Sequence, residues 1–464
     1  MWAALVGVAA VILFQQAETL RWVWDRVVES PLPGVVVIPV VLAVLVGVFL
    51  LGWLLSWPWW RATRWRVDDE AISVRRGVLS TQLRTARFDR VQAVDLIEPL
   101  APRLFRLAGV RVETAGGADS AVSVEYLPRA RAEQLRDALL GRVRVLPDAP
   151  DGPDAPAAPE PAARPGTVVV PQIPATRSLA AAVLAGPTAV TLLIVLVSAA
   201  TPAGLALLLP AVAGLGPWIW GLLNRSWRFT AVLSGRFTAV SPGRDDDRLL
   251  VVTFGFSERR RQTVPLDRIH AVRVSQPLLW RPLGWWKVDV DIAGYGEPGQ
   301  GGATTAVLPV GTLDQAFALV ALLGPLDRGQ VDTLVRPGRV PEPRAGVRVY
   351  RSPASARWVS PVDRTRQAVV LVAGEGSGRG TDRNHDTALV CHCGRWRRSA
   401  SVIDPAHVQE LSHRRGPLRR MLGLATVRFD LVPGPVTMVG RDLSSVDAVD
   451  LLTRLRQRTL PTGR

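Results

Sequence analysis

The chain has 464 residues, of which 56 are Lys or Arg and 40 are Asp or Glu, so its formal net charge at neutral pH is +16. Hydrophobic residues make up 48% of the chain, which excludes a protein that is disordered throughout. Two cysteines are too few for a framework of disulfides. The length predicts about three modules of roughly 150 residues each.

Three long stretches carry no charged residue: 1–17, 30–60 and 178–224, the last broken near its middle at 201–204. A helix that crosses a bilayer needs about 20 apolar residues. We therefore expect two transmembrane hairpins, one over 1–60 and one over 177–224. Buried helices of a soluble protein are the alternative, which the length of the uncharged stretches disfavours. A signal peptide is a further alternative for the first stretch, but that stretch has no basic segment before it.

Arginine and tryptophan gather at the ends of these stretches. Basic residues mark the cytoplasmic side of a membrane and tryptophan its interface. We therefore expect the soluble parts to be cytoplasmic in a multi-pass protein of a bacterial plasma membrane. The residues expected at the membrane interface or facing lipid are Arg61, Arg64, Arg66, Arg225, Arg228, Trp57, Trp59, Trp60, Trp218 and Trp220.

The most informative feature is an internal repeat. Residues 90–117 align without gaps with 268–295, at an offset of 178, and with 407–434, at an offset of 317. The same offsets align residues outside the window that revealed the repeat, which is an independent check. The repeated residues are Gly77, Gly255, Gly394, Arg103, Arg281 and Arg420.

Each copy has strand-like alternation followed by one amphipathic helix, predicted at 129–141, 314–324 and 445–458. Thr312 and Gln315 have the spacing of a capping box at the start of the second helix. The boundaries that we predict are module 1 at 61–145, a Pro/Ala linker at 146–176, module 2 at 225–327, a second linker at 328–366 and module 3 at 367–460.

Three segments of copy one carry a family resemblance: Arg90-Val91-Gln92-Ala93-Val94, Arg103-Leu104-Phe105-Arg106-Leu107 and Val112-Glu113-Thr114-Ala115-Gly116-Gly117. They resemble the bacterial pleckstrin-homology (PH) domain of the membrane-flanked, YdbS/YdbT-like type. The resemblance implies an α+β membrane protein. It would have four transmembrane helices in two hairpins and three PH-like antiparallel β-barrel modules, each closed by a C-terminal helix.

The sequence departs from the family pattern at several points. Copy one has Arg106 where the family has glycine, whereas Gly284 and Gly423 keep the glycine. Copy two has His270 in place of the glutamine, and copy three has His407 in place of the arginine.

No motif of catalysis is present: there is no Ser-His-Asp arrangement, no P-loop and no GxGxxG. The family has no catalytic motif to transfer, so we expect neither an enzyme nor a cofactor. Cys391-His392-Cys393 invites a metal site, but a structural zinc site has four ligands in paired spacing. Buried cysteines of a strand are the preferred interpretation, and no metal is expected.

The excess of arginine has two interpretations, an ordinary solvated surface and attraction to anionic lipid headgroups. Module 3 is the best docking candidate, through Arg414, Arg415, Arg419 and Arg420. Nucleic acid is not expected, because many arginines lie at the ends of the uncharged stretches.

The favoured function is a non-enzymatic membrane scaffold whose modules bind protein partners or anionic lipid. The resemblance implies an association with envelope stress or antimicrobial-peptide resistance, and a membrane-protein partner with a single PH-like module. A homo-oligomer also stays open. The alternative is a small membrane export or channel component gated by the modules. The absence of charge from 30–60 and 178–224 argues against it.

Overall fold

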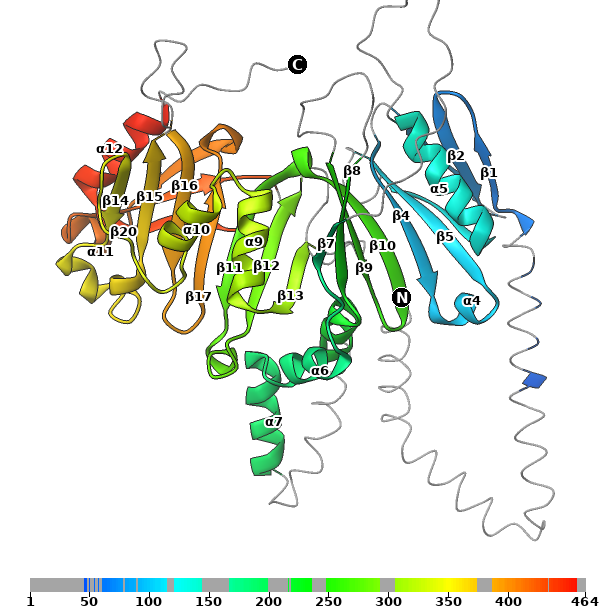
Figure 1. Cartoon of the computed structure of the whole chain (residues 1–464), viewed down its shortest axis with the longest axis horizontal. Coiled ribbons are helices and arrows are strands. Elements are labelled where there is room, and N and C mark those ends of the chain that lie inside the picture. The colour runs from blue at the N-terminus through cyan, green and yellow to red at the C-terminus, as the bar shows by residue number, and fades with distance from the viewer. Residues whose placement is uncertain are drawn as a thin grey trace, which may run out of the picture. The chain divides into compact units, whose positions relative to one another are not determined.

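The structure is a computed structural model, and it describes residues 46–47, 50, 54, 57, 61–77, 80–88, 91–114, 121–143, 167–198, 216, 218–235, 248–292, 305–373, 386–432 and 434–456 (Figure 1). The chain divides into two compact units. Unit 1 comprises Met1–Phe88 and Val190–Gly221, and unit 2 comprises Asp89–Ala189 and Leu222–Arg464.

Unit 1 contains a three-stranded antiparallel sheet in the order β1 (Arg64–Val67), β2 (Ala71–Arg76), β3 (Gln82–Arg87). The alternation of β2 places Ile72 and Val74 on one face, where both are buried. This alternation is the local pattern that predicts a strand with one covered face.

Unit 2 contains two seven-stranded sheets and one three-stranded sheet, all antiparallel. The first sheet has the order β6 (Val122–Pro128), β5 (Leu107–Thr114), β4 (Val91–Pro99), β10 (Glu258–Pro265), β9 (Arg248–Phe254), β8 (Thr230–Gly235), β7 (Thr167–Val170). The second has the order β13 (Ala306–Gly311), β12 (Trp286–Ile292), β11 (Ile269–Gln276), β17 (Arg398–Ile403), β16 (Asp386–Cys393), β15 (Ala368–Ala373), β14 (Val347–Arg351). The third is β18 (Glu410–Arg414), β19 (Leu424–Asp430), β20 (Met438–Ser444).

Short and medium helices connect and cover these strands. The α-helices are α4 (Leu100–Leu104), α5 (Arg129–Val143), α6 (Ala175–Val183), α7 (Gly186–Ser198), α9 (Leu313–Leu323), α10 (Arg328–Leu334), α11 (Pro417–Met421) and α12 (Ser445–Arg456). The 3₁₀ turns are η3 (Leu266–Arg268), η4 (Leu278–Trp280), η5 (Ala354–Trp358), η6 (Arg364–Arg366) and η7 (Pro405–His407).

The helices predicted to close each copy are confirmed as α5, α9 and α12. The capping box of α9 is also confirmed. The Thr312 hydroxyl accepts from the Gln315 backbone N–H at 3.3 Å, and the Gln315 side chain accepts from the Thr312 N–H at 3.0 Å. The segment predicted as the second linker contains α10 and β14, and β14 pairs with β15.

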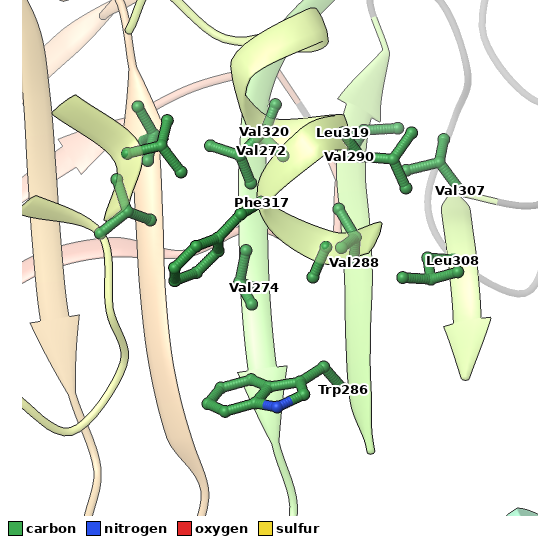
Figure 2. Close-up of a cluster of buried hydrophobic side chains, with 14 of the residues drawn as sticks. Val272, Val274, Trp286, Val288, Val290, Val307, Leu308, Phe317, Leu319 and Val320 are labelled. Atoms are coloured by element: carbon green, nitrogen blue, oxygen red, sulfur yellow. The ribbon is translucent and has the colours of Figure 1, made fainter. Parts of the chain in front are cut away.

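Helix α9 covers strands β11, β12 and β13 (Figure 2). Phe317 and Val320 of the helix lie among Val272, Val274 and Val288 of the strands, all of them nearly or fully buried. Burying one such side chain stabilises the fold by roughly 1.5 to 3 kcal/mol. The apolar residues that recur every 3.6 positions along the helix therefore pack in one core with those that recur every two positions along the strands.

Two expectations about the fold class are wrong. Among the residues that the structure describes, no helix is long and apolar enough to cross a membrane, which contradicts four transmembrane helices in two hairpins. The uncharged stretch that begins at 178 starts inside α6, which ends at Val183 before α7 begins at Gly186. Hydropathy does not detect this break. Residues 1–45, 199–215 and 146–166 of the predicted linker at 146–176 lie outside the described residues, and the rest of that linker contains β7 and the start of α6.

The expectation of three β-barrel modules is also wrong, because the four described sheets are open rather than closed. Module 1 contributes β4–β6 to a sheet that continues into β8–β10 of module 2, and module 2 contributes β11–β13 to a sheet that continues into module 3. Alternation within a strand does not show whether its second edge pairs inside its own module or with the next one.

Candidate functional site: the module junctions and tips

Junction 1 is the antiparallel pairing of β4 with β10, which joins module 1 to module 2. Arg259 lies opposite Glu98, Arg260 opposite Ile97, and Arg261 opposite Leu96. Glu98 and Leu96 are buried there. An edge strand otherwise exposes a row of unpaired N–H and C=O groups, so the junction satisfies backbone groups of both modules.

Junction 2 is the equivalent pairing of β11 with β17, which joins module 2 to module 3. Its register continues over six pairs, from Ala271 opposite Ile403 to Gln276 opposite Arg398. Both faces of this pairing contribute to cores, since Val272 and Val402 belong to one buried cluster and Ala271 and Ile403 to another.

The two junctions use the same register. Adding the repeat offset of 178 to Ile97 gives Ser275. The offset between copies two and three is 317 − 178 = 139, and adding it to Arg260 gives Ser399. Ser275 and Ser399 are paired in junction 2. The module-to-module contact is therefore repeated along the chain together with the modules themselves.

A repeated arginine binds across each junction. Arg103 Nη2 donates to the carbonyl oxygen of Phe256 at 3.3 Å, in the turn that leads into β10. Arg281 Nη2 donates to the carbonyl oxygens of Arg395 and Trp396, in the turn that leads into β17, the latter at 3.2 Å. The repeat thus identifies a residue that holds the next module.

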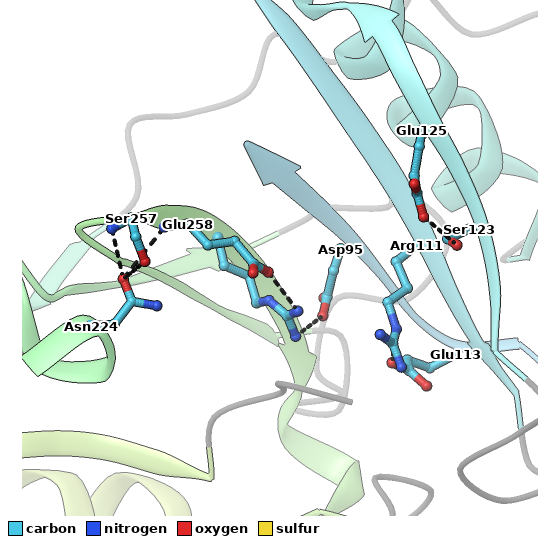
Figure 3. Close-up of polar contacts among 9 residues, drawn as sticks. Asp95, Arg111, Glu113, Ser123, Glu125, Asn224, Ser257 and Glu258 are labelled. Atoms are coloured by element: carbon cyan, nitrogen blue, oxygen red, sulfur yellow. Dashed lines mark hydrogen bonds and ion pairs between the residues drawn. The ribbon is translucent and has the colours of Figure 1, made fainter. Parts of the chain in front are cut away.

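Repeated glycines lie in the two turns that receive these arginines, at Gly255 and Gly394, and in the equivalent turn of module 1, at Gly77. Gly77, Gly255 and Gly394 all have positive φ, +113°, +122° and +87°. A Cβ on Gly255 would lie 1.8 Å from the carbonyl oxygen of Glu258, and the other two glycines have the same close approach. Asn224 supports the middle turn, because its side-chain oxygen accepts from the backbone N–H of Phe256 at 2.8 Å. It also accepts from the backbone N–H of Ser257 at 2.9 Å (Figure 3).

Junction 1 buries charged side chains (Figure 3). Asp95 of β4 is fully buried, with a carboxylate oxygen 4.0 Å from Nη1 of Arg260. Burial raises the pKa of Asp95 to about 7, although Arg260 acts in the opposite direction. Arg136 of α5 reaches across the same junction and donates from Nη2 to Thr263 Oγ1 at 2.6 Å.

Junction 2 has the reverse arrangement of charge. Asp95 and Arg111 are cross-strand partners in β4 and β5, and the offset of 178 replaces them with Arg273 and Asp289 in β11 and β12. Arg273 bonds to Asp289 at 3.2 Å, and Lys287 lies 2.7 Å from the same carboxylate. Burial pushes the pKa of Asp289 up, but Lys287 and Arg273 outweigh it and hold that pKa below its ordinary value. The cross-strand pair beside each junction strand therefore has the opposite order of charge in modules 1 and 2.

Each module also has an exposed loop that we call its tip: residues 100–106, 278–284 and 417–423 for tips 1, 2 and 3. The tips are equivalent under the repeat offsets, and each ends in the left-handed region, at Arg106 (φ +56°), Gly284 (φ +63°) and Gly423 (φ +66°). Arg106 thus keeps the backbone conformation of the glycine that it replaces.

Large apolar side chains are exposed at every tip. Leu104 is 79% exposed and Phe105 76% at tip 1, and Met421 is 83% exposed at tip 3. Leu279 and Leu283 of tip 2 are also exposed. Apolar exposure at equivalent positions of three modules indicates a contact surface rather than chance.

The residues predicted at the membrane interface are exposed wherever the structure describes them. Trp57, Arg61, Arg64, Arg66, Trp218, Trp220, Arg225 and Arg228 are all exposed. Arg61 lies over the ring of Trp57, with 5.2 Å from its guanidinium carbon to the ring centroid, and Arg66 bonds to Asp68 at 2.6 Å. Trp59 and Trp60 lie outside the described residues.

The predicted docking residues of module 3 divide into two kinds. Arg414, Arg415 and Arg420 are exposed. Arg419 instead bonds through Nε to the buried carboxylate of Asp442 at 2.6 Å, so that arginine holds the module together.

The Cys391-His392-Cys393 segment lies in β16. Cys391 is buried, His392 Nε2 lies 2.8 Å from the carbonyl oxygen of Leu334, and Cys393 Sγ lies 3.1 Å from Ser399 Oγ. Burial lowers the pKa of His392 to about 4. Within the described ranges, no three His, Cys, Asp or Glu side chains are grouped so that they could hold a metal ion.

Sequence reasoning missed Asp95, Arg136 and Asn224, whose partners lie far away along the chain. The sequence contains one signal of the junctions. Arg103 and Arg281 recur at equivalent positions, and the family has no catalytic role that would explain their recurrence.

Comparison with known proteins agrees with the repeat. A model of the bacterial PH domain matches residues 6–143, 180–325 and 384–459, one match for each copy. The chain belongs to the bacterial PH domain family. This bacterial PH-domain protein is also similar to the UPF0699 transmembrane protein YdbT of Bacillus subtilis (strain 168), with 23% identity over 280 residues. The aligned part is 54% of this chain and 54% of the relative, so the match spans about half of that protein's length. No solved structure matches the chain.

Proposed function

We propose that this bacterial PH-domain protein is a non-enzymatic scaffold at the cytoplasmic face of a bacterial membrane. Its modules dock on anionic lipid through the tips and offer the surface of module 3 to a protein partner. The observation that carries the proposal is the recurrence of the tips, each with exposed apolar side chains at equivalent positions.

The tips have the composition of an interfacial contact. At tip 1 the exposed Arg106 follows Leu104 and Phe105, and at tip 3 the exposed Arg420 precedes Met421. Apolar side chains gain roughly 1.5 to 3 kcal/mol each when they leave water completely. Each basic residue near an anionic surface adds about 1 kcal/mol. Three weak tips on one chain act together, because the first contact raises the effective concentration of the others.

Several further observations support a membrane setting. The relative from Bacillus subtilis is named a transmembrane protein. Exposed arginine and tryptophan occur together at Trp57 and Arg61. The family resemblance extends the proposal to envelope stress or antimicrobial-peptide resistance and to a membrane partner with a single PH-like module. Self-association would serve the same scaffold role.

The test uses an environment-sensitive dye on single cysteines introduced into the full chain by Leu104→Cys, Leu283→Cys or Met421→Cys. Val446→Cys is the matched control, since Val446 is 79% exposed but lies on α12 outside the tips. The unsubstituted chain measures labelling of Cys391, which is buried, and Cys393.

With vesicles that contain phosphatidylglycerol, we expect the emission of dye at the tips to shift to shorter wavelength, and less so at high salt. Dye at position 446 should keep its emission. The proposal of lipid docking is refuted if dye at all three tips emits alike with and without vesicles.

A further inference from the structure

In modules 1 and 2, the next module pairs with one particular strand edge. In module 3, the equivalent edge has no such partner among the described residues. Strand β18 is the equivalent of β4 and β11 under the repeat offsets, and in the described part of the chain it pairs only with β19. His413 and Arg414 are exposed on β18, whereas the equivalent residues Val274 and Ser275 of β11 are fully buried under β17.

The arginine that holds the next module in modules 1 and 2 is also present in module 3, where its side chain is exposed. Arg103 and Arg281 donate to turn carbonyls of modules 2 and 3. Arg420, their equivalent, is exposed and has no side-chain partner among the described residues. The third copy therefore has both parts of a junction, a strand edge and its arginine, and no strand of the described residues completes it.

The charge of this edge defines what fits it. In junction 1, Arg259 of the incoming strand lies opposite Glu98. The offset of 317 replaces Glu98 with Arg415, Ile97 with Arg414 and Leu96 with His413. An incoming strand in the same register thus meets basic side chains. Opposite charges across a strand pair stabilise it, and like charges destabilise it.

A second copy of this chain lacks the complementary charge. Its equivalent of β10 is β3, and the residues that the register places opposite Arg415, Arg414 and His413 are Thr81, Gln82 and Leu83, none of them acidic. Charged side chains on an edge strand are also a common device against unwanted pairing, and the basic residues of β18 disfavour a basic strand.

We propose that β18 accepts an acidic edge strand of a partner protein, antiparallel and in the register of the two internal junctions. Arg420 donates to a backbone carbonyl in the turn that leads into that strand. The inference rests on the proposed scaffold role for its protein partner, but it does not depend on lipid docking at the tips. Strand addition to an exposed sheet edge is an established mode of recognition.

Two synthetic hairpins serve as probes, both copying residues 249–265, which include β10. The basic probe keeps the natural sequence, and the acidic probe carries Arg259→Glu, Arg260→Glu and Arg261→Glu. In the proposed register these three positions lie opposite Arg415, Arg414 and His413. Binding to the full chain is measured by fluorescence anisotropy, with circular dichroism as the check that each variant is folded.

We expect the acidic probe to bind the unchanged chain more tightly than the basic probe. Arg414→Glu should weaken the acidic probe roughly threefold or more and strengthen the basic probe, because one cross-strand charge pair changes sign. Arg420→Ala should weaken the acidic probe without reversing the preference. Arg441→Glu is the matched control, since Arg441 is exposed on β20 of the same module and away from β18.

The inference is overturned if neither probe binds, if the basic probe binds the unchanged chain as well as the acidic one, or if Arg441→Glu acts as strongly as Arg414→Glu. The dye measurement at the tips reports separately on lipid docking. If dye at the tips responds to vesicles while neither hairpin binds, the lipid-docking scaffold stands and only the acidic-strand partner is lost.

Discussion

Replacing Gly255 by alanine should break the turn that receives Arg103. Gly255 has φ +122°, a region that side chains other than glycine rarely adopt, and its new Cβ would lie 1.8 Å from the carbonyl oxygen of Glu258. Backbone strain of this kind costs about 1 to 3 kcal/mol. The clash involves backbone and must move the turn, so we expect a loss of ~3 kcal/mol or more in the local free energy of opening.

Gly284 provides the matched control in the same module. It also has positive φ, +63°, but a Cβ there would meet no atom within 4 Å. Gly284→Ala should therefore cost only the left-handed backbone, about 1 to 2 kcal/mol. Hydrogen exchange of the β9 and β10 amides in the full chain measures the first loss, and exchange of the β11 and β12 amides the second. Equal losses for the two variants, or none for Gly255→Ala, would refute the reasoning from the clash.

Three further predictions concern the junctions and the thiols. Arg281→Ala should speed hydrogen exchange in β17 by the equivalent of about 1 to 2 kcal/mol, because it removes hydrogen bonds from a charged donor. Arg420→Ala should leave hydrogen exchange in module 3 unchanged in the absence of a partner protein. Equal effects of the two variants would contradict the assigned role of Arg281. Burial raises the pKa of Asp95 to about 7 from an ordinary value of 3.8, so the folded protein holds a proton that the unfolded chain releases. The contribution of Asp95 to stability is then complete below about pH 4 and lost as the pH rises through about 7, with an upper limit of roughly 4 kcal/mol. Asp95→Asn should flatten that part of a pH series of denaturant unfolding, and an unchanged slope would show that Asp95 does not titrate there. A maleimide reagent should modify the half-buried Cys393 before Cys391, whose pKa burial raises. Mass spectrometry that locates the label would contradict the burial of Cys391 if both thiols were modified at the same rate.

Sequence reasoning succeeded where the information is local. The helix that closes module 2 follows from the spacing of Phe317 and Val320 and from the Thr312–Gln315 capping box, which are readable within a few residues. The repeat was equally accessible, because equivalent positions keep their residue type. Glycines such as Gly255 recur since only glycine fits the turn.

The junctions could not be predicted, because they depend on which distant strand completes an edge. The alternation of β4 is the same whether its second edge is free or pairs with β10. Only the structure shows that Ile97 lies opposite Arg260. The closed barrel was a wrong prediction for this reason. The prediction of membrane-spanning helices over 177–224 was wrong for a different reason, because hydropathy does not show the break between α6 and α7.

The same limit explains the module 3 arginines. By sequence, Arg414, Arg415, Arg419 and Arg420 form one basic segment. In the structure Arg419 holds the buried carboxylate of Asp442, whereas Arg414, Arg415 and Arg420 are exposed. A sequence therefore shows which residues are charged, but it does not show which residue each of them contacts.

The most direct test of the account is hydrogen exchange over the three equivalent strand edges of the full chain. The account predicts that β4 and β11 are protected like central strands, because they pair with β10 and β17, while β18 exchanges quickly and gains protection when the acidic hairpin is added. Exchange in β4 and β11 as fast as in β18 would contradict the shared sheets, and with them the scaffold of joined modules.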